Sequence, residues 1–477
     1  MNRIGNLLVV VGLAAGLVPC SVVAAAPRPA AEPRAETPAR VTERVEALLQ
    51  NVLKTRRIPG VAAAVIQGGR PVFVKGYGYA DVEHKVPVSE LTVFQLASVT
   101  KQFTAAGVML LVQDGKLGLD DPITRHLPDL PEAWKEVTVR HLLTHTSGIT
   151  SYTSLPLDFR KDYSRTELLG LVRDLPLQWK AGERWAYNNS GYYLLGMLIE
   201  KLSGVSYGEF LEQRIFGKLG LSTTRVNDLR AVIPNRAEGY TLSGRELRRG
   251  EYVSPTQPYA AGALVSSIHD MVRWATTVRA REILRKESWA EIFRPYRLND
   301  GKPTTYGFGW SVDQHQGHPR YHHGGGIPGF STNIAYYPDD DLAVIVLCNL
   351  DGGHAGFLTN QIAAEYVTDL VPKPIEDPDP ATTARLRKIV EGIAAGTADE
   401  AEFAPETRKA LFPDRIREGQ RHLGELGKLG EFRLVAHQKT DDHRQLTYRA
   451  LFGDTPMRVS LALDADGKIA GIGFSPE

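Results

Sequence analysis

The first regular feature along the chain is a set of apolar residues with helical spacing. They recur every three or four positions, as the buried face of an α-helix requires: Val45, Leu48, Leu49, Val52 and Leu53. Two apolar runs follow at 61–66 and 71–77, separated by Gly68 and Gly69, which are typical of a turn between strands. The pattern predicts a helix followed by a β-hairpin.

A second group of strand-like runs lies far downstream, at 306–312, 331–337 and 342–349, and a helical pattern follows at 355–370. The chain between the two groups is dominated by helical and loop patterns. Strands at both ends with helices between them predict an α+β fold over 41–370, in which one antiparallel sheet carries a helical lobe. The active site would then lie between the sheet and the lobe.

The last hundred residues have a pattern of their own. Four prolines between 371 and 380 break the preceding helix and predict a linker. A helix is expected at 381–395, and four strands should follow at 432–438, 445–452, 458–463 and 469–474. The sequence thus predicts a small α+β accessory domain over 381–477, for which we expect a role in substrate shaping or docking.

The N-terminus has the layout of a secretory signal peptide. Arg3 precedes an apolar stretch, Leu7–Val18, and small residues surround Ala25, after which we expect cleavage. The stretch is too short to span a bilayer, so no transmembrane segment is expected in the mature chain. Lipidation of Cys20 is disfavoured because Pro19 precedes it. We expect a signal peptide at 1–25, a flexible linker at 26–40, and a periplasmic or secreted protein.

Charge and cysteine content exclude some functions. The chain has 56 lysines and arginines against 55 aspartates and glutamates, so no basic field exists to attract nucleic acid. Only Cys348 would remain after signal cleavage, which rules out an intramolecular disulfide.

The sharpest candidate for chemistry is the pair Ser98 and Lys101, just before the apolar run 103–112. If Ser98 opens a helix, a residue three positions later returns to the same face, and the Lys101 amine reaches the Ser98 hydroxyl. A buried lysine loses its proton more easily and can act as the base that a serine nucleophile needs. The alternative is a serine helix cap with Lys101 in solvent.

Tyr187 and Asn189 form the second candidate group, directly before a helical run at 192–202. Two residues apart in an extended segment, they can face the same side. A phenol beside a lysine ammonium is expected to have a lowered pKa and to exchange protons with a nucleophile. Asn189 can orient Lys101 or a substrate amide. The alternative is a surface tyrosine and an asparagine helix cap.

The third candidate is the glycine-rich segment from His323 to Gly326, placed on or beside a strand. Glycine permits close backbone approach, and the N–H groups of Gly326 and Ser98 can form an oxyanion hole. His323 and Gly325 are candidate substrate-binding residues. A glycine-rich loop with a solvent-facing imidazole is the alternative.

Metal and cofactor chemistry are not expected. His315, His318, His322, His323 and His354 are numerous, but no glutamate-containing metalloprotease motif accompanies them. The dinucleotide-like spacing of Gly324, Gly326 and Gly329 contains Pro328 and lacks a surrounding βαβ unit. No G-x-S-x-G motif offers another nucleophile.

Taken together, these segments resemble the serine β-lactamase and penicillin-binding-protein superfamily, especially its class C β-lactamase, D-peptidase and esterase branch. The resemblance covers about 41–370 and rests on an ordered series of motifs: Gly76-Tyr77-Gly78, Phe94 to Lys101, Leu142 to Gly148, Tyr187-x-Asn189, Ala261-Gly262, His323-x-Gly325 and Pro328-Gly329-Phe330. It implies a β-lactamase/transpeptidase-like fold and a serine hydrolase in which Ser98 is acylated, Lys101 and Tyr187 move protons, and water releases the acyl group. His145, Ser147, Gly262 and Asp270 are read as structural.

One departure from the family pattern bears on the substrate. Where β-lactamases of this family carry Lys-Thr-Gly, this chain has His323-Gly324-Gly325, which weakens recognition of a substrate carboxylate. The resemblance then favours ester or amide, D-peptide-like substrates. The alternatives are a β-lactamase or D-alanyl carboxypeptidase proper, and a non-catalytic peptidoglycan-binding or sensor protein. The expected partner is a small acyl, peptide or peptidoglycan-like substrate, and the sequence leaves the oligomeric state open.

Overall fold

The computed structural model describes residues 38–244, 246–352, 354–439, 443–453 and 455–476. These form two compact units, one from Pro38 to Leu370 and one from Val371 onward. The signal peptide predicted at 1–25, Cys20 and most of the predicted linker lie outside the described residues. Among the described residues, no helix is both long and apolar enough to cross a membrane.

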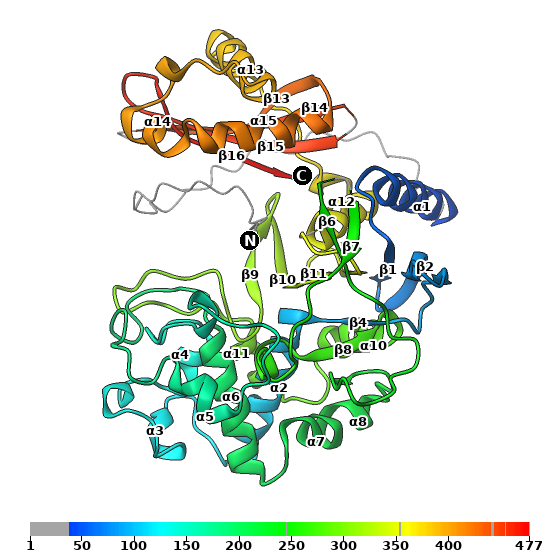
Figure 1. Cartoon of the computed structure of the whole chain (residues 1–477), viewed down its shortest axis with the longest axis vertical. Helices are drawn as coiled ribbons and strands as arrows, with labels where there is room; N and C mark the ends of the chain where they lie inside the picture. The colour runs from blue at the N-terminus through cyan, green and yellow to red at the C-terminus, as the bar shows by residue number, and fades with distance from the viewer. Residues whose placement is uncertain (1–37, 245, 353, 440–442, 454, 477) are drawn as a thin grey trace, which may run out of the picture. The chain divides into compact units, whose positions relative to one another are not determined.

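The first unit is built on a seven-stranded sheet in the order β3-β2-β1-β12-β11-β10-β9. Strands β1, β2, β9, β10 and β11 of this sheet are labelled in Figure 1. Its two central strands come from opposite ends of the unit and pair antiparallel, with Val61 opposite Cys348. The antiparallel sheet and the helices around it confirm the predicted α+β fold. The strands are β1 (Gly60–Gln67), β2 (Arg70–Asp81), β3 (Val86–Pro87), β9 (Ser311–His315), β10 (His318–Ile327), β11 (Phe330–Tyr337) and β12 (Leu342–Cys348).

The central strands are apolar on both faces because helices cover both. Every residue of β12 is buried, as is all of β1 except Gln67. One face packs against α1 (Pro38–Thr55) and α12 (His354–Tyr366), whereas the other packs against α10 (Ile268–Ala280) and the helical lobe. Continuous apolar runs are the expected signature of strands buried on both faces.

The helical lobe surrounds α2 (Thr100–Gln113), which is buried along nearly its whole length. Phe103 of α2 stacks on Trp274 of α10, with ring centroids 4.2 Å apart. The other helices of this unit are α3 (Ile123–His126), α4 (Val139–Leu143), α5 (Arg165–Gly170), α6 (Asn189–Ser203), α7 (Tyr207–Leu211), α8 (Gly217–Leu219), α9 (Tyr259–Gly262) and α11 (Lys286–Ile292).

Short strands connect the lobe to the main sheet. They form a three-stranded sheet in the order β4-β8-β5 and a two-stranded sheet, β6-β7. Their bounds are β4 (Val93–Gln95), β5 (Arg225–Val226), β6 (Tyr240–Ser243), β7 (Glu246–Arg249) and β8 (Leu264–Ser267). Strand β4 matters for the chemistry because it leads directly into the turn that carries Ser98.

The prediction of a strand at 306–312 is wrong over most of that range. Strand β9 begins only at Ser311, and a bend through Gly307 and Gly309 precedes it. Gly309 has φ of +74°, and a Cβ there would lie 2.5 Å from the carbonyl oxygen of Lys101. The close approach of Gly309 to the backbone of α2 therefore outweighs the strand propensity of the neighbouring aromatic residues.

The second unit packs helices against a four-stranded antiparallel sheet, β13-β14-β15-β16. Its strands match the predicted runs, whereas the helix at 414–426 was not predicted. The elements are α13 (Pro380–Ala395), α14 (Pro405–Leu411), α15 (Asp414–Leu426), β13 (Leu429–Lys439), β14 (Arg444–Phe452), β15 (Thr455–Leu463) and β16 (Ile469–Pro476).

Candidate active site

Ser98 lies in a short 3-10 helix, η1 (Ala97–Val99), which runs directly into α2 at Thr100. Ala97 has φ of +46°, a left-handed conformation that is unfavourable for alanine. The turn is held by its neighbours, since Leu96 donates its N–H to Leu264 (2.8 Å) and accepts a hydrogen bond from Thr332 Oγ1 (2.8 Å). Ser98 is thus presented by a strained backbone fixed between strands β8 and β11.

Lys101, on the first turn of α2, is completely buried, and its Nζ lies 3.1 Å from Ser98 Oγ. Two further acceptors surround the nitrogen, Asn189 Oδ1 at 2.9 Å and the Ala261 carbonyl oxygen at 2.7 Å. Burial lowers the Lys101 pKa well below its usual range. A neutral amine can donate to those two oxygens and keep its lone pair toward the Ser98 hydroxyl. This is the geometry of a base beside a nucleophile.

The Ala261 carbonyl is a functional group that reasoning from the sequence missed. It comes from α9, far from Lys101 in the chain, and completes the hydrogen bonding of the amine. Any residue can offer a carbonyl oxygen, so the side chain of Ala261 carries no signal for this role.

Tyr187 and Asn189 reach Lys101 from the start of α6, as their spacing predicted. Asn188 between them is extended and caps the helix, accepting a hydrogen bond from the Gly191 N–H. The Lys101 Nζ lies 4.7 Å from the centre of the Tyr187 ring, and the Tyr187 hydroxyl forms a hydrogen bond with Ser98.

The expected lowering of the Tyr187 pKa is wrong in direction. Burial of the hydroxyl raises its pKa, and the hydrogen bond to Ser98 only partly offsets this, although 39% of the whole residue is exposed. The physical reason lies in Lys101, because an uncharged amine offers no ammonium to stabilise a phenolate. Tyr187 is therefore a neutral phenol, suited to donating a proton before accepting one.

His145 lies behind Tyr187 and supports it. Its ring is buried 4.4 Å from the Tyr187 ring, and its Nδ1 accepts a hydrogen bond from the Asn188 N–H at 3.1 Å. Burial lowers its pKa well below the usual range, so it is neutral. These contacts fix the segment that carries Tyr187 and agree with the structural reading of His145.

His323 lies on β10, with 5% of its surface exposed. Its Nδ1 is 2.7 Å from the Gly324 carbonyl oxygen, which can only accept, so Nδ1 carries the proton. Nε2 then accepts a hydrogen bond from the Tyr306 hydroxyl at 2.8 Å. Burial lowers the His323 pKa to about 3, and the imidazole is neutral at ordinary pH.

Tyr306 is thus a second functional residue that the sequence did not single out. It was assigned to a strand, and nothing in the local pattern connects it with His323.

Gly325 and Gly326 have different environments. A Cβ on Gly325 would lie 2.2 Å from the Leu96 carbonyl oxygen, so only glycine lets β10 approach the Ser98 turn this closely. A Cβ on Gly326 would meet nothing within 4 Å. Strand β9 pairs with β10 only as far as His322, which leaves the Gly326 edge of the strand open beside the turn.

The other histidines have ordinary protein partners. His318 pairs with Asp340 (2.8 Å) and His322 with Asp313 (3.1 Å). Within the described ranges, no three His, Cys, Asp or Glu side chains converge as a metal site requires.

Asp270, read as structural from the sequence, accepts hydrogen bonds from the backbone and side chains of Thr223 and Thr224 at 2.7–2.9 Å. It ties the β5 region to α10 and is not in contact with Ser98.

Comparison with known proteins identifies the family to which this chain belongs. The sequence model of the Beta-lactamase family matches residues 45–368. A penicillin-binding protein of Bacillus subtilis (strain 168) is 32% identical over 407 residues, which is 77% of this chain and 89% of that protein.

Solved structures show the same fold. A D-amino acid amidase from Ochrobactrum anthropi is 27% identical, with a TM-score of 0.62 over 69% of this chain and 98% of the amidase. An octameric penicillin-binding protein homologue from Pyrococcus abyssi is 24% identical, with a TM-score of 0.62 over 90% of this chain and 94% of that one. The second likeness concerns the fold alone.

Proposed function

The chain belongs to the Beta-lactamase family and is a serine hydrolase, and from this premise we propose that Ser98 is its nucleophile. The observation that carries the proposal is the position of Lys101 Nζ, 3.1 Å from Ser98 Oγ, where no carboxylate of the described residues pairs with the amine and keeps it charged. A buried, uncharged lysine beside a serine hydroxyl has a clear use as a general base.

The proposed reaction begins when the Lys101 amine takes the Ser98 proton and Ser98 Oγ attacks the carbonyl carbon of the substrate. The N–H groups of Ser98 and Gly326 stabilise the oxyanion. Support for Gly326 comes from its open strand edge beside the η1 turn. Gly325 permits that approach and Asn189 holds Lys101 in place.

Tyr187 then gives its proton to the leaving group and regains one from Lys101, so the alcohol or amine departs neutral and Ser98 carries the acyl group. Water attacks the acyl-enzyme in the second half, its proton passes back through the same pair, and a carboxylic acid leaves. The two groups exchange one proton between them in each half of the reaction.

The substrate class we propose is a neutral ester or amide, D-peptide-like in the case of an amide. His323 is neutral and its Nε2 is occupied by Tyr306, so it offers no cation to a substrate carboxylate. The similarity of this chain to a D-amino acid amidase and to a D-stereospecific amidohydrolase supports amide substrates. A β-lactamase or D-alanyl carboxypeptidase would need that cation.

We also propose that the protein is exported after cleavage behind Ala25, and that residues from Val371 onward form an accessory domain. N-terminal sequencing of the protein secreted by its host tests the first proposal, with retention of residues 1–25 as the contrary result.

The experiment for the catalytic proposal is intact-mass spectrometry after incubation with p-nitrophenyl esters, D-amino acid amides and a β-lactam. We expect a covalent adduct on the wild type and none on Ser98→Ala, with ester or amide turned over faster than the β-lactam. An adduct on Ser98→Ala would exclude Ser98 as the nucleophile. Absence of both adduct and turnover on every compound would favour a binding protein, and fast β-lactam turnover would favour a β-lactamase.

A further inference from the structure

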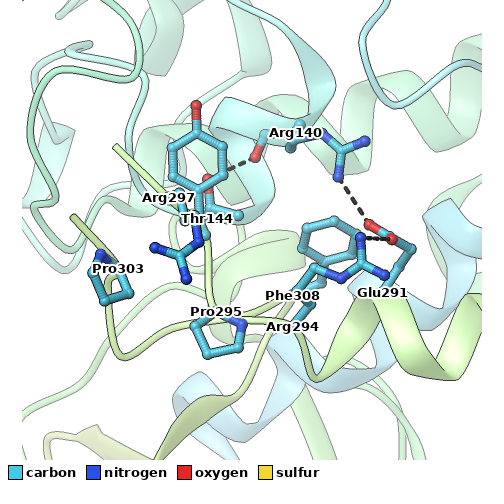
Figure 2. Close-up of a pocket in the computed structure, with 9 residues that line it drawn as sticks. Arg140, Thr144, Glu291, Arg294, Pro295, Arg297, Pro303 and Phe308 are labelled. Atoms are coloured by element: carbon cyan, nitrogen blue, oxygen red, sulfur yellow. Dashed lines mark hydrogen bonds and ion pairs between the residues drawn. The ribbon is translucent and has the colours of Figure 1, made fainter. Parts of the chain in front are cut away.

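A cavity of about 540 Å³ lies in the helical lobe and shares no residue with the proposed catalytic group. It is bounded by Arg140 and Thr144 of the α4 region, by Glu291 of α11 and by the segment 294–308 (Figure 2). Its volume is within the range of small-molecule sites, which usually combine apolar walls with a few polar groups.

The lining of this cavity is positively charged. Its three arginines outnumber the carboxylates that pair with them: Glu291 binds Arg140 at 3.0 Å and Arg294 at 2.7 Å, and Asp120, outside the lining, binds Arg140 at 2.8 Å. Arg297 donates a hydrogen bond to the Gly301 carbonyl oxygen at 3.0 Å, and no carboxylate in the described part of the chain lies within ion-pair distance of it. Arg297 is therefore the lining cation that is available to bind an anionic ligand.

The remaining walls are apolar. Pro295, Pro303 and Phe308 lie around the arginines (Figure 2), and the ring of Tyr296 completes the lining. The planar guanidinium group binds a carboxylate through two parallel hydrogen bonds. A ligand that satisfies both features has one carboxylate and an aromatic or aliphatic body.

We propose that this cavity binds small carboxylic acids with an apolar body. If the proposed function is correct, compounds of this class are also the acid products of the enzyme, because hydrolysis of an ester or amide converts the acyl group into a carboxylate. Binding does not depend on that function, whereas an effect on catalysis does.

The structure offers a route for such an effect. The cavity-lining segment also carries Tyr306, whose hydroxyl donates a hydrogen bond to His323. Its backbone is tied by one hydrogen bond from the Tyr296 N–H to the Tyr306 carbonyl oxygen (3.2 Å). Thr144 is the neighbour of His145, which contacts Tyr187. A ligand in the cavity thus contacts Thr144, one position from His145, and Phe308, two positions from Tyr306. We therefore expect a bound ligand to change kcat/KM by at least about twofold.

The test uses the full chain carrying Ser98→Ala, so that nothing is turned over, and ¹⁹F NMR of 4-fluorophenylacetate. We expect saturable binding, at least about tenfold weaker for the neutral 4-fluorophenylacetamide and for Arg297→Gln. Arg125→Gln removes an equal charge from a helix outside the cavity and should leave binding unchanged.

Equal binding of acid and amide, or undiminished binding to Arg297→Gln, would overturn the proposed site. Circular dichroism and the melting temperature establish that each variant is folded. Ester hydrolysis by the wild type with and without 4-fluorophenylacetate is measured separately. Binding without any change in kcat/KM would retain the site and disprove its coupling to catalysis.

Discussion

The active site and the arginine-lined cavity both depend on basic side chains, but burial and pairing give these side chains opposite properties. Lys101 and His323 are buried and pair with no carboxylate in the part of the chain that the structure describes, and the pKa of each is lowered. Arg140 is also largely enclosed, yet its hydrogen bond to Asp120 raises its pKa, and the guanidinium stays charged.

The difference shows how one fold provides both a base and a cation. Desolvation without a counter-charge produces a neutral nitrogen that can accept a proton, which suits catalysis. A neighbouring carboxylate preserves the positive charge, which suits the recognition of anions. Residue type matters as well: arginine has a far higher intrinsic pKa than histidine or lysine, so the exposed Arg297 stays charged without needing a carboxylate partner.

The largest expected effect comes from removing the buried base. Lys101→Met keeps an apolar chain of similar length but no proton acceptor, and we expect ester hydrolysis to fall by roughly a thousandfold or more. Steady-state kinetics on a p-nitrophenyl ester measure this. Circular dichroism and the melting temperature establish whether the variant is folded, and retention of more than a tenth of the activity in folded protein would contradict the role of Lys101.

Tyr187→Phe should have the next largest effect, a fall in kcat of about a hundredfold. The phenol is neutral and hydrogen-bonded to Ser98, so its loss removes the proposed proton donor while leaving the ring over Lys101. The fall should be greater for amides than for p-nitrophenyl esters, since amines need a proton to leave and p-nitrophenolate does not. An equal fall for both would point to a merely structural role.

The pH dependence of kcat/KM follows from the two pKa directions. Activity should rise with pH as Lys101 loses its proton, and this rise ends well below the usual lysine pKa of 10.5. The fall on the alkaline side should come only above pH 10, because the Tyr187 pKa is raised above its usual value of 10.0. A loss of activity below pH 10 in protein that remains folded would contradict this assignment.

His323→Lys tests whether a charged group can be restored in the position where the family carries lysine. We expect hydrolysis of a carboxylate-bearing substrate to improve relative to a neutral ester by about tenfold. The ratio of the two kcat/KM values is the measurement. His323→Gln is the matched control, because it is polar without charge, and an equal change in that variant would exclude a charge effect.

The smallest effect is expected at the cavity. Arg297 is exposed, and none of the described carboxylates lies within ion-pair distance of it, so Arg297→Gln should change the free energy of unfolding by no more than about 0.5 kcal/mol. Urea denaturation measures this change. A loss of several kcal/mol would mean that the arginine supports the fold and would weaken its assignment to ligand binding.

Much of the fold was predictable because it depends on local periodicity. The apolar spacing of Val45, Leu49 and Val52 placed α1, and the continuous apolar runs placed β1 and β12. The bend at 306–310 was not predictable from the sequence, because there the close approach of Gly309 to the Lys101 backbone outweighs the local strand preference.

The sequence by itself determined the family and the candidate residues Ser98, Lys101, Tyr187, Asn189 and His323, since side-chain chemistry and spacing are written along the chain. Only the tertiary structure decided their protonation. Burial of Lys101 against the Ala261 carbonyl, and of His323 against Tyr306, depends on atoms brought together from distant segments. A pKa is set by the surroundings of a group in space, so no local pattern could have supplied it.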